Sequence, residues 1–122
     1  MSRTFYACLL TAILTAAATH FAFRLTANQQ PHAASRLENG RVRVSEIVYQ
    51  PGVPRPRQTR QTDQVIIFLD DCRYERTDSA TGSKSIRIRK SGDVIWHSRG
   101  EDAPVLVNAG AAPYRTMLIE LK

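Results

Sequence analysis

The chain has 122 residues, with 17 Lys and Arg against 11 Asp and Glu, which gives a formal net charge of +6 at pH 7. This length suffices for one domain with one modest hydrophobic core. The two cysteines are too few for a disulfide scaffold or a four-cysteine zinc site. The mild basic excess does not indicate a protein that wraps nucleic acid.

The first 27 residues have the pattern of a targeting segment. A positive start at Arg3 is followed by a nearly uncharged apolar run over residues 5–23, which Arg24 ends. Small residues at 16–18 fit a signal-peptidase site, so we expect a periplasmic or secreted protein. The alternative is an uncleaved hydrophobic helix that anchors the chain, since a membrane span needs about 20 apolar residues. Both interpretations place residues 28–122 outside the cytoplasm.

The remaining chain predicts strands and no helix. Residues 28–38 are polar and aperiodic, which is typical of a linker. Residues 65–69, VIIFL, resemble a central buried strand, and Phe68 and Trp96 are expected in the core. Alternation over residues 83–89 predicts that Ile86 and Ile88 face inward while Arg87 and Arg89 face water. About eight short strands predict an all-β antiparallel sandwich or barrel over residues 39–122.

Two blocks of the sequence resemble the cupins, and most closely small exported single-domain cupins. Residues 37–44 with the Pro51-Gly52 turn resemble the first strand and turn of that superfamily. Residues 92–96, Gly100-Glu101, Asn108 and the closing segment 114–122 resemble the second cupin motif and the last strand. The resemblance covers about residues 37–122 and implies a single jelly-roll β-barrel with a binding site in its mouth.

Cupins are known for a metal held by three histidines and a glutamate. The resemblance assigns these ligand positions to Gln58, Arg60, Gln64 and Ala103. A first-row metal needs about three imidazole, thiolate or carboxylate ligands, and none of these four residues supplies one. We therefore expect neither a metal nor another cofactor in this chain.

The other chemistry-bearing residues form no recognisable site. His97, Asp63 and Cys72 could act as substitute metal ligands, but their spacing matches no metal motif. Adjacent Asp70 and Asp71 are typical of a turn, so no catalytic residue is assigned. The aromatic residues are scattered among the predicted strands, which does not favour nucleic-acid binding.

The vacant ligand positions favour a binding module. Side chains two apart in a strand share a face, so Gln58 and Arg60 are expected to point into the barrel. We expect a small anion there, with Arg60 as main contact and Gln58 and Gln64 as neutral partners. The alternatives for Arg60 are an ion pair with Asp63 or simple solvation.

Three functional readings stay open at this point. The first is an exported, metal-free, cupin-like module that binds a small anion or a protein partner. The second is a cupin-type enzyme, either metal-independent or with an unrecognised metal arrangement. The third is an accessory subunit tethered to a membrane by residues 5–23. A homodimer is implied by the resemblance alone.

Overall fold

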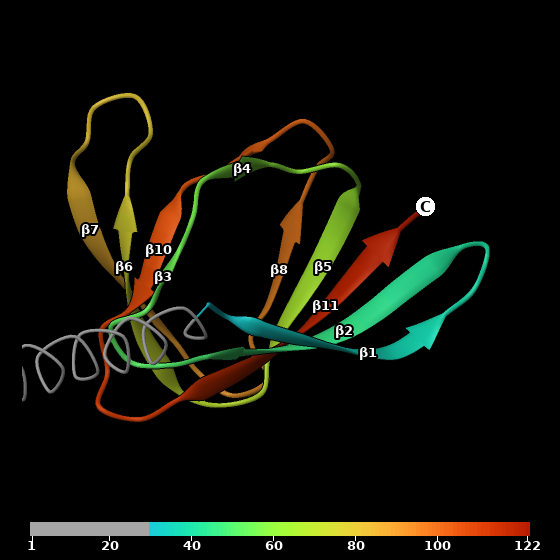
Figure 1. The fold of residues 1–122 in the computed structure, drawn as a ribbon, viewed down its shortest axis with the longest axis horizontal. Helices are drawn as coiled ribbons and strands as arrows, with labels where there is room; N and C mark the ends of the chain where they lie inside the picture. Colours follow the sequence, from blue (N-terminus) through green and yellow to red (C-terminus); the bar gives the residue numbers. More distant parts are fainter. Residues whose placement is uncertain (1–29) are drawn as a thin grey trace, which may run out of the picture.

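The computed structural model describes residues 30–122, in which eleven β-strands and no helix are found (Figure 1). The strands are β1 (His32–Glu38), β2 (Val42–Tyr49), β3 (Pro54–Arg55), β4 (Gln58–Thr59), β5 (Asp63–Phe68), β6 (Cys72–Thr77), β7 (Lys84–Arg89), β8 (Val94–His97), β9 (Asp102–Ala103), β10 (Val105–Asn108) and β11 (Tyr114–Leu121). Within this part of the chain, no helix is long and apolar enough to cross a membrane. The predicted targeting segment lies outside the described residues.

Two large sheets face each other and form the barrel. One has the strand order β1-β2-β11-β5-β8, and the other has the order β3-β10-β6-β7. A short third sheet, β4-β9, crosses between them at one end, as Figure 1 shows. All strand pairs are antiparallel, so the predicted all-β antiparallel class is confirmed.

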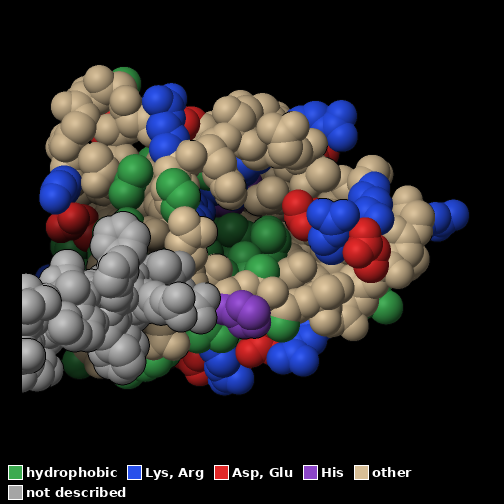
Figure 2. Space-filling view, viewed as in Figure 1, with side chains coloured by type: hydrophobic (Ala, Val, Ile, Leu, Met, Phe, Trp, Pro, Cys, Tyr) green, Lys and Arg blue, Asp and Glu red, His purple; other side chains and the backbone are tan. Residues whose placement is uncertain are grey.

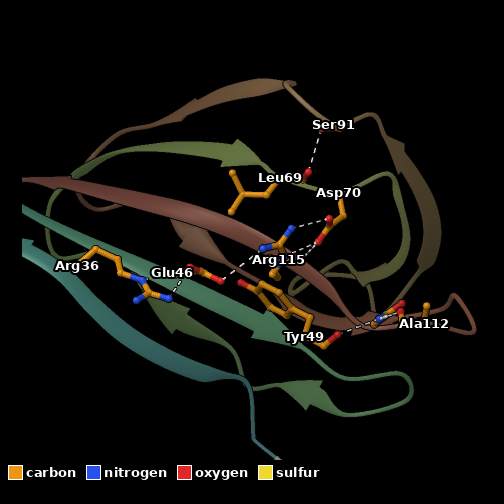
Figure 3. A network of polar contacts seen from close by, with 9 residues as sticks. Arg36, Glu46, Tyr49, Leu69, Asp70, Ser91, Ala112 and Arg115 are labelled. Carbon is orange, nitrogen blue, oxygen red and sulfur yellow. Dashed lines mark hydrogen bonds and ion pairs between the residues drawn. The ribbon is translucent and has the colours of Figure 1, made fainter.

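The prediction of a linker over residues 28–38 is wrong from His32 onward, because His32–Glu38 forms strand β1. This strand pairs with β2 from His32 opposite Val48 to Glu38 opposite Arg43. Its side chains are exposed on both faces, apart from partly buried Ala34. A strand with no buried face carries no hydrophobic alternation, and its backbone ladder alone defines it. An ion pair of 2.7 Å between Arg36 and Glu46 also joins β1 to β2 (Figure 3).

Four aromatic side chains form the core at one end of the barrel: Tyr49, Phe68, Tyr74 and Tyr114. Tyr49 and Tyr114 lie opposite each other on β2 and β11, and their ring centroids are 4.8 Å apart. The core position predicted for Phe68 is confirmed. The one predicted for Trp96 is wrong, because this side chain is 53% exposed on the outer face of β8.

The inward orientation predicted for Ile86 and Ile88 on β7 is wrong, whereas Arg87 is exposed as predicted although it also borders the space between the sheets. Arg87 and Arg89 line the space between the sheets, while Ile86 and Ile88 are 42% and 68% exposed. The ladder explains this orientation, because Arg87 lies directly opposite the core residue Tyr74. Directly opposed residues share a face. A period of two shows which side chains lie together but not which group faces inward.

Candidate functional site

The space between the two large sheets contains a cavity of about 390 Å³. Figure 2 shows it as a hollow with hydrophobic side chains at its bottom. Its walls combine aliphatic, aromatic and basic groups: Ile66, Ile95, Pro104 and Leu106; Tyr49, Phe68, Tyr74 and Tyr114; Arg55, Arg60, Arg76, Arg87 and Arg89; and His97, Glu101, Asp102 and Thr116.

The strand ladders arrange these groups in layers. Phe68 is paired with Thr116 at the aromatic end. Two residues before Phe68 on β5, Ile66 lies opposite Ile95 of β8. Two residues earlier still, Gln64 lies opposite His97. The cavity therefore passes from an aromatic floor through an aliphatic middle to a polar end beside Arg60.

Arg60 is fixed at the polar end by its backbone and by one side-chain bond. Its backbone N–H donates to the Glu101 carbonyl at 3.0 Å, and its carbonyl accepts from Gly100 at 2.9 Å. Its Nη1 donates to Oε1 of Gln64 at 2.8 Å, and the residue is only 6% exposed. The guanidinium is thus held in one orientation inside the barrel.

Two cavity arginines contain buried N–H groups without a hydrogen-bond partner in the described part of the chain. Within residues 30–122, three buried side-chain polar atoms have no hydrogen-bond partner: the Nε of Arg55, the Nε of Arg60 and the Thr62 hydroxyl. Arg55 also donates from Nη2 to the Pro104 carbonyl, so its guanidinium is anchored at one side. A buried donor without a partner costs about 1–3 kcal/mol, and more when it belongs to a charged group.

No carboxylate within residues 30–122 forms a direct ion pair with the arginines of the cavity. None of its five arginines lies within 4.0 Å of a carboxylate oxygen in the described part of the chain, whereas Arg36, Arg43, Arg57 and Arg115 outside it all do. The two acidic residues of the lining have other partners. Asp102 accepts from Arg57 Nε at 2.6 Å, and Glu101 lies 2.9 Å from Nδ1 of His97. Burial, and then the like charge of Arg55, lowers the pKa of Arg60, although a guanidinium still stays protonated.

His97 lines the cavity, opposite in orientation to Trp96, as its place on the strand predicts. Burial lowers its pKa, and the charges of Arg60 and Arg55 act in the same direction. The hydrogen bond with Glu101 opposes this shift without reversing it. The net effect favours the neutral imidazole, which adds no charge to the basic cavity.

Two tyrosine hydroxyls complete the set of donors. Burial raises the pKa of Tyr49 and, more strongly, that of Tyr114, so both keep their protons at neutral pH. Among the described residues, the hydroxyl of Tyr74 is contacted by Arg89 Nε at 3.5 Å. Buried phenols that stay protonated offer O–H groups to an acceptor bound in the cavity.

The structure brings together only part of the candidate site from the sequence. Arg60 lines the cavity and contacts Gln64, but neither Gln64 nor the exposed Gln58 is among the lining residues. Strand β4 ends at Thr59, so the expected alternation between positions 58 and 60 is interrupted. Asp63 accepts from the Arg99 N–H at 2.8 Å and forms no ion pair with Arg60.

The sequence alone did not indicate the roles of Arg76, Arg87 and Arg89. Their signal was present in the alternating pattern of β6 and β7, but the orientation of these strands depends on their pairing. Arg55 was one of several arginines in a loop-like segment, and only the fold separates it from exposed Arg57.

The residues at the predicted metal positions do not fit a metal. Arg60 and Gln64 form a hydrogen bond with each other, and Ala103 is fully buried on β9. In the described residues, no group of three or more His, Cys, Asp or Glu side chains could hold a metal ion. Cys72 lies beside Arg89 in the β6–β7 ladder, away from His97, and burial raises the pKa of its thiol to about 11.

Comparison with known proteins identifies the fold. No family model and no curated protein matches the chain. A cupin domain from Bordetella pertussis Tohama I superposes with a TM-score of 0.68 at 16% identity, over 76% of this chain and 94% of that one. An RmlC-like cupin from Methanocaldococcus jannaschii, with a double-stranded β-helix fold, gives 0.59 at 11% identity, over 76% and 81%.

A third similar structure is an enzyme. The polyketide cyclase RemF from Streptomyces resistomycificus gives a TM-score of 0.54 at 17% identity, over 68% of this chain and 56% of that one. At these identities the likeness concerns the fold alone. The chain therefore has the cupin fold, a single β-barrel that contains an arginine-rich cavity.

Proposed function

We propose that this chain is a metal-free binding module that takes a small anion, a carboxylate or a phosphate, into its barrel. The observation that carries the proposal is the pair of buried, unpartnered Nε–H groups on Arg55 and Arg60. Both belong to a cavity whose arginines form no ion pair within residues 30–122.

A bound anion would provide hydrogen-bond acceptors for the Nε–H groups of Arg55 and Arg60. Burying a charge without a partner is unfavourable, and a carboxylate or phosphate oxygen accepts from a guanidinium in a charge-assisted hydrogen bond. Gln64 occupies one terminal nitrogen of Arg60 and leaves its Nε–H for the ligand. The hydroxyls of Tyr49 and Thr116, which also line the cavity, add neutral donors.

The proposal is tested by calorimetry on the full chain with acetate, phosphate and sulfate, comparing the unmodified protein with Arg60→Gln. We expect saturable binding that weakens at least about tenfold in the variant, the lower end of the range for hydrogen bonds to charged groups. The matched control is Arg73→Gln, which removes the same charge from an exposed position on β6. Equal binding by all three proteins, or by none, contradicts the proposal.

Export is a second part of the proposal, because the apolar run over residues 5–23 after Arg3 is typical of a signal or an anchor. A fusion of residues 1–40 to a reporter that is active only outside the cytoplasm should be positive. N-terminal sequencing of the full chain after expression then distinguishes cleavage from anchoring. A stable but silent fusion contradicts export.

A further inference from the structure

We infer that the ligand carries two anionic groups at the ends of an apolar body, as a medium-length dicarboxylate does. One group binds at Arg55 and Arg60, and the second binds at Arg76 and Arg87. The inference rests on the proposed function for the first group and adds a second binding locus on the opposite side of the cavity.

The two loci are connected by one sheet, in which Arg76 lies on the inner strand β6 and is separated from Arg55 by Leu106 on β10. Arg55 is on β3 and Arg87 is on β7, the outermost strands of the order β3-β10-β6-β7. Neighbouring strands are about 4.8 Å apart, so the two backbones are separated by about 14 Å. A ligand that contacts both arginines must extend across the sheet.

The surface between the two loci is apolar. Leu106 on β10 and Tyr74 on β6 line the cavity between Arg55 and Arg87. Ile66 and Ile95 line it from the opposite sheet. Such a surface favours hydrocarbon and does not hydrate a polar linker. A cavity of about 390 Å³ also lies in the range that holds organic ligands, about 300–1,000 Å³.

Arg76 and Arg87 are available for a ligand. Within residues 30–122, neither side chain donates a hydrogen bond or forms an ion pair within 4.0 Å. Arg89 differs, because its guanidinium carbon lies 5.6 Å from the centroid of the Phe68 ring and its Nε contacts the Tyr74 hydroxyl. Asp102 feels the charge of Arg76, but its carboxylate is bound by Arg57 and Ser79.

The orientation of β7 is an independent observation in favour of this second locus. Arg87 lines the cavity while remaining exposed to water itself, and Ile86 and Ile88 are exposed on the other face of the strand. An arginine that lines the cavity without a carboxylate partner among residues 30–122 is suited to binding a second anionic group.

The test uses straight-chain acids that differ only in the second carboxylate. Calorimetry on the full chain compares octanoate with octanedioate, and then a series from butanedioate to decanedioate. We expect octanedioate to bind at least about tenfold more tightly than octanoate, since it adds a charge-assisted contact. Affinity should pass through a maximum at an intermediate chain length.

Variants separate the two loci. In Arg76→Gln/Arg87→Gln, octanedioate should bind no more tightly than octanoate, while octanoate itself is unaffected. Arg60→Gln should weaken both acids, and Arg73→Gln should weaken neither. The inference is overturned if the unmodified protein binds octanedioate no more tightly than octanoate, or if the double variant still binds octanedioate more tightly. Either result leaves the single anion site intact. If the unmodified protein does not bind octanoate, and Arg60→Gln therefore changes nothing, the proposed function itself fails.

Discussion

Arg60 donates from Nη1 to Oε1 of Gln64 at 2.8 Å, and both residues occupy positions that the cupin resemblance assigns to metal ligands. A guanidinium and an amide thus make a direct contact at positions where the resemblance has a histidine and a glutamate ligand. Gln64 is also directly opposite His97 in the β5–β8 ladder, and His97 in turn contacts Glu101. Two of the four ligand positions are therefore adjacent in the structure, although neither carries a metal-binding side chain.

This relationship predicts that a metal site can be restored by two substitutions. Arg60→His with Gln64→Glu removes the positive charge and, together with His97, provides three ligands of the required types. We expect the double variant to retain about one equivalent of zinc after dialysis, measured by plasma mass spectrometry, and the unmodified chain to retain none.

A matched control places the same new side chains outside the cavity. Gln58→His with Gln61→Glu alters two exposed residues and should retain no zinc. Stoichiometric metal in the unmodified chain, or a double variant as empty as the control, would show that the assigned positions are incorrect.

Asn108 is predicted to be the polar side chain on which the closing turn depends. It is 2% exposed, and its Nδ2 donates to the carbonyls of Tyr49 and Ala112 at 3.0 and 2.9 Å. Its Oδ1 accepts from the Gly110 N–H at 2.8 Å. Asn108→Ala leaves these backbone groups without their partner, so it should lower the free energy of unfolding by about 2–4 kcal/mol.

Urea unfolding followed by circular dichroism measures this loss. The control is Gln50→Ala at an exposed position, where the change should stay within about 0.5 kcal/mol. If the two variants are equally stable, the bonds of Asn108 contribute nothing net to the fold.

The pair of Asp70 and Arg115 predicts a pH-dependent contribution to stability. Nε and Nη2 of Arg115 both donate to the Asp70 carboxylate at 3.0 Å, and these bonds hold the pKa of that carboxyl below its usual range (Figure 3). A lowered pKa in the folded state means that the contribution is complete above about pH 3.9, the ordinary value for Asp, and is lost as the pH falls through the folded value.

Asp70→Asn should therefore destabilise the chain at pH 7 by less than about 1 kcal/mol, because the pair is partly exposed. The difference in Tm between the two proteins should shrink below about pH 3.9 and in high salt. A difference that is constant from pH 7 to pH 3, or that grows on acidification, contradicts the assigned ion pair.

The sequence predicted the parts of this fold that depend on local patterns. The strand that contains Val65 and Phe68 and the closing strand from Tyr114 carry hydrophobic patterns that survive in the structure as β5 and β11. Edge strand β1 could not be recognised, because a strand with two exposed faces has no apolar alternation.

The candidate site was predictable only in part, for the same physical reason. Arg60 was identified because the cupin resemblance assigned it a ligand position. Ile86 and Ile88 were misplaced because alternation leaves the inward face undetermined, and only the pairing of their neighbour Arg87 with Tyr74 decides it. The separate environments of Arg55 and Arg57 arise from a change in backbone direction around β3 and β4, which a short segment with several prolines does not reveal.

The most direct measurement concerns the two buried Nε–H groups themselves. Nitrogen-15 NMR of arginine side chains resolves each Nε–H, and Arg→Lys variants at positions 55, 60 and 73 assign the signals. On titration with acetate or phosphate at constant ionic strength, the Nε–H resonances of Arg55 and Arg60 should shift saturably with a shared dissociation constant, while that of exposed Arg73 stays in place. Signals of Arg55 and Arg60 that do not move, or that move only in parallel with Arg73, would contradict an anion site in the barrel.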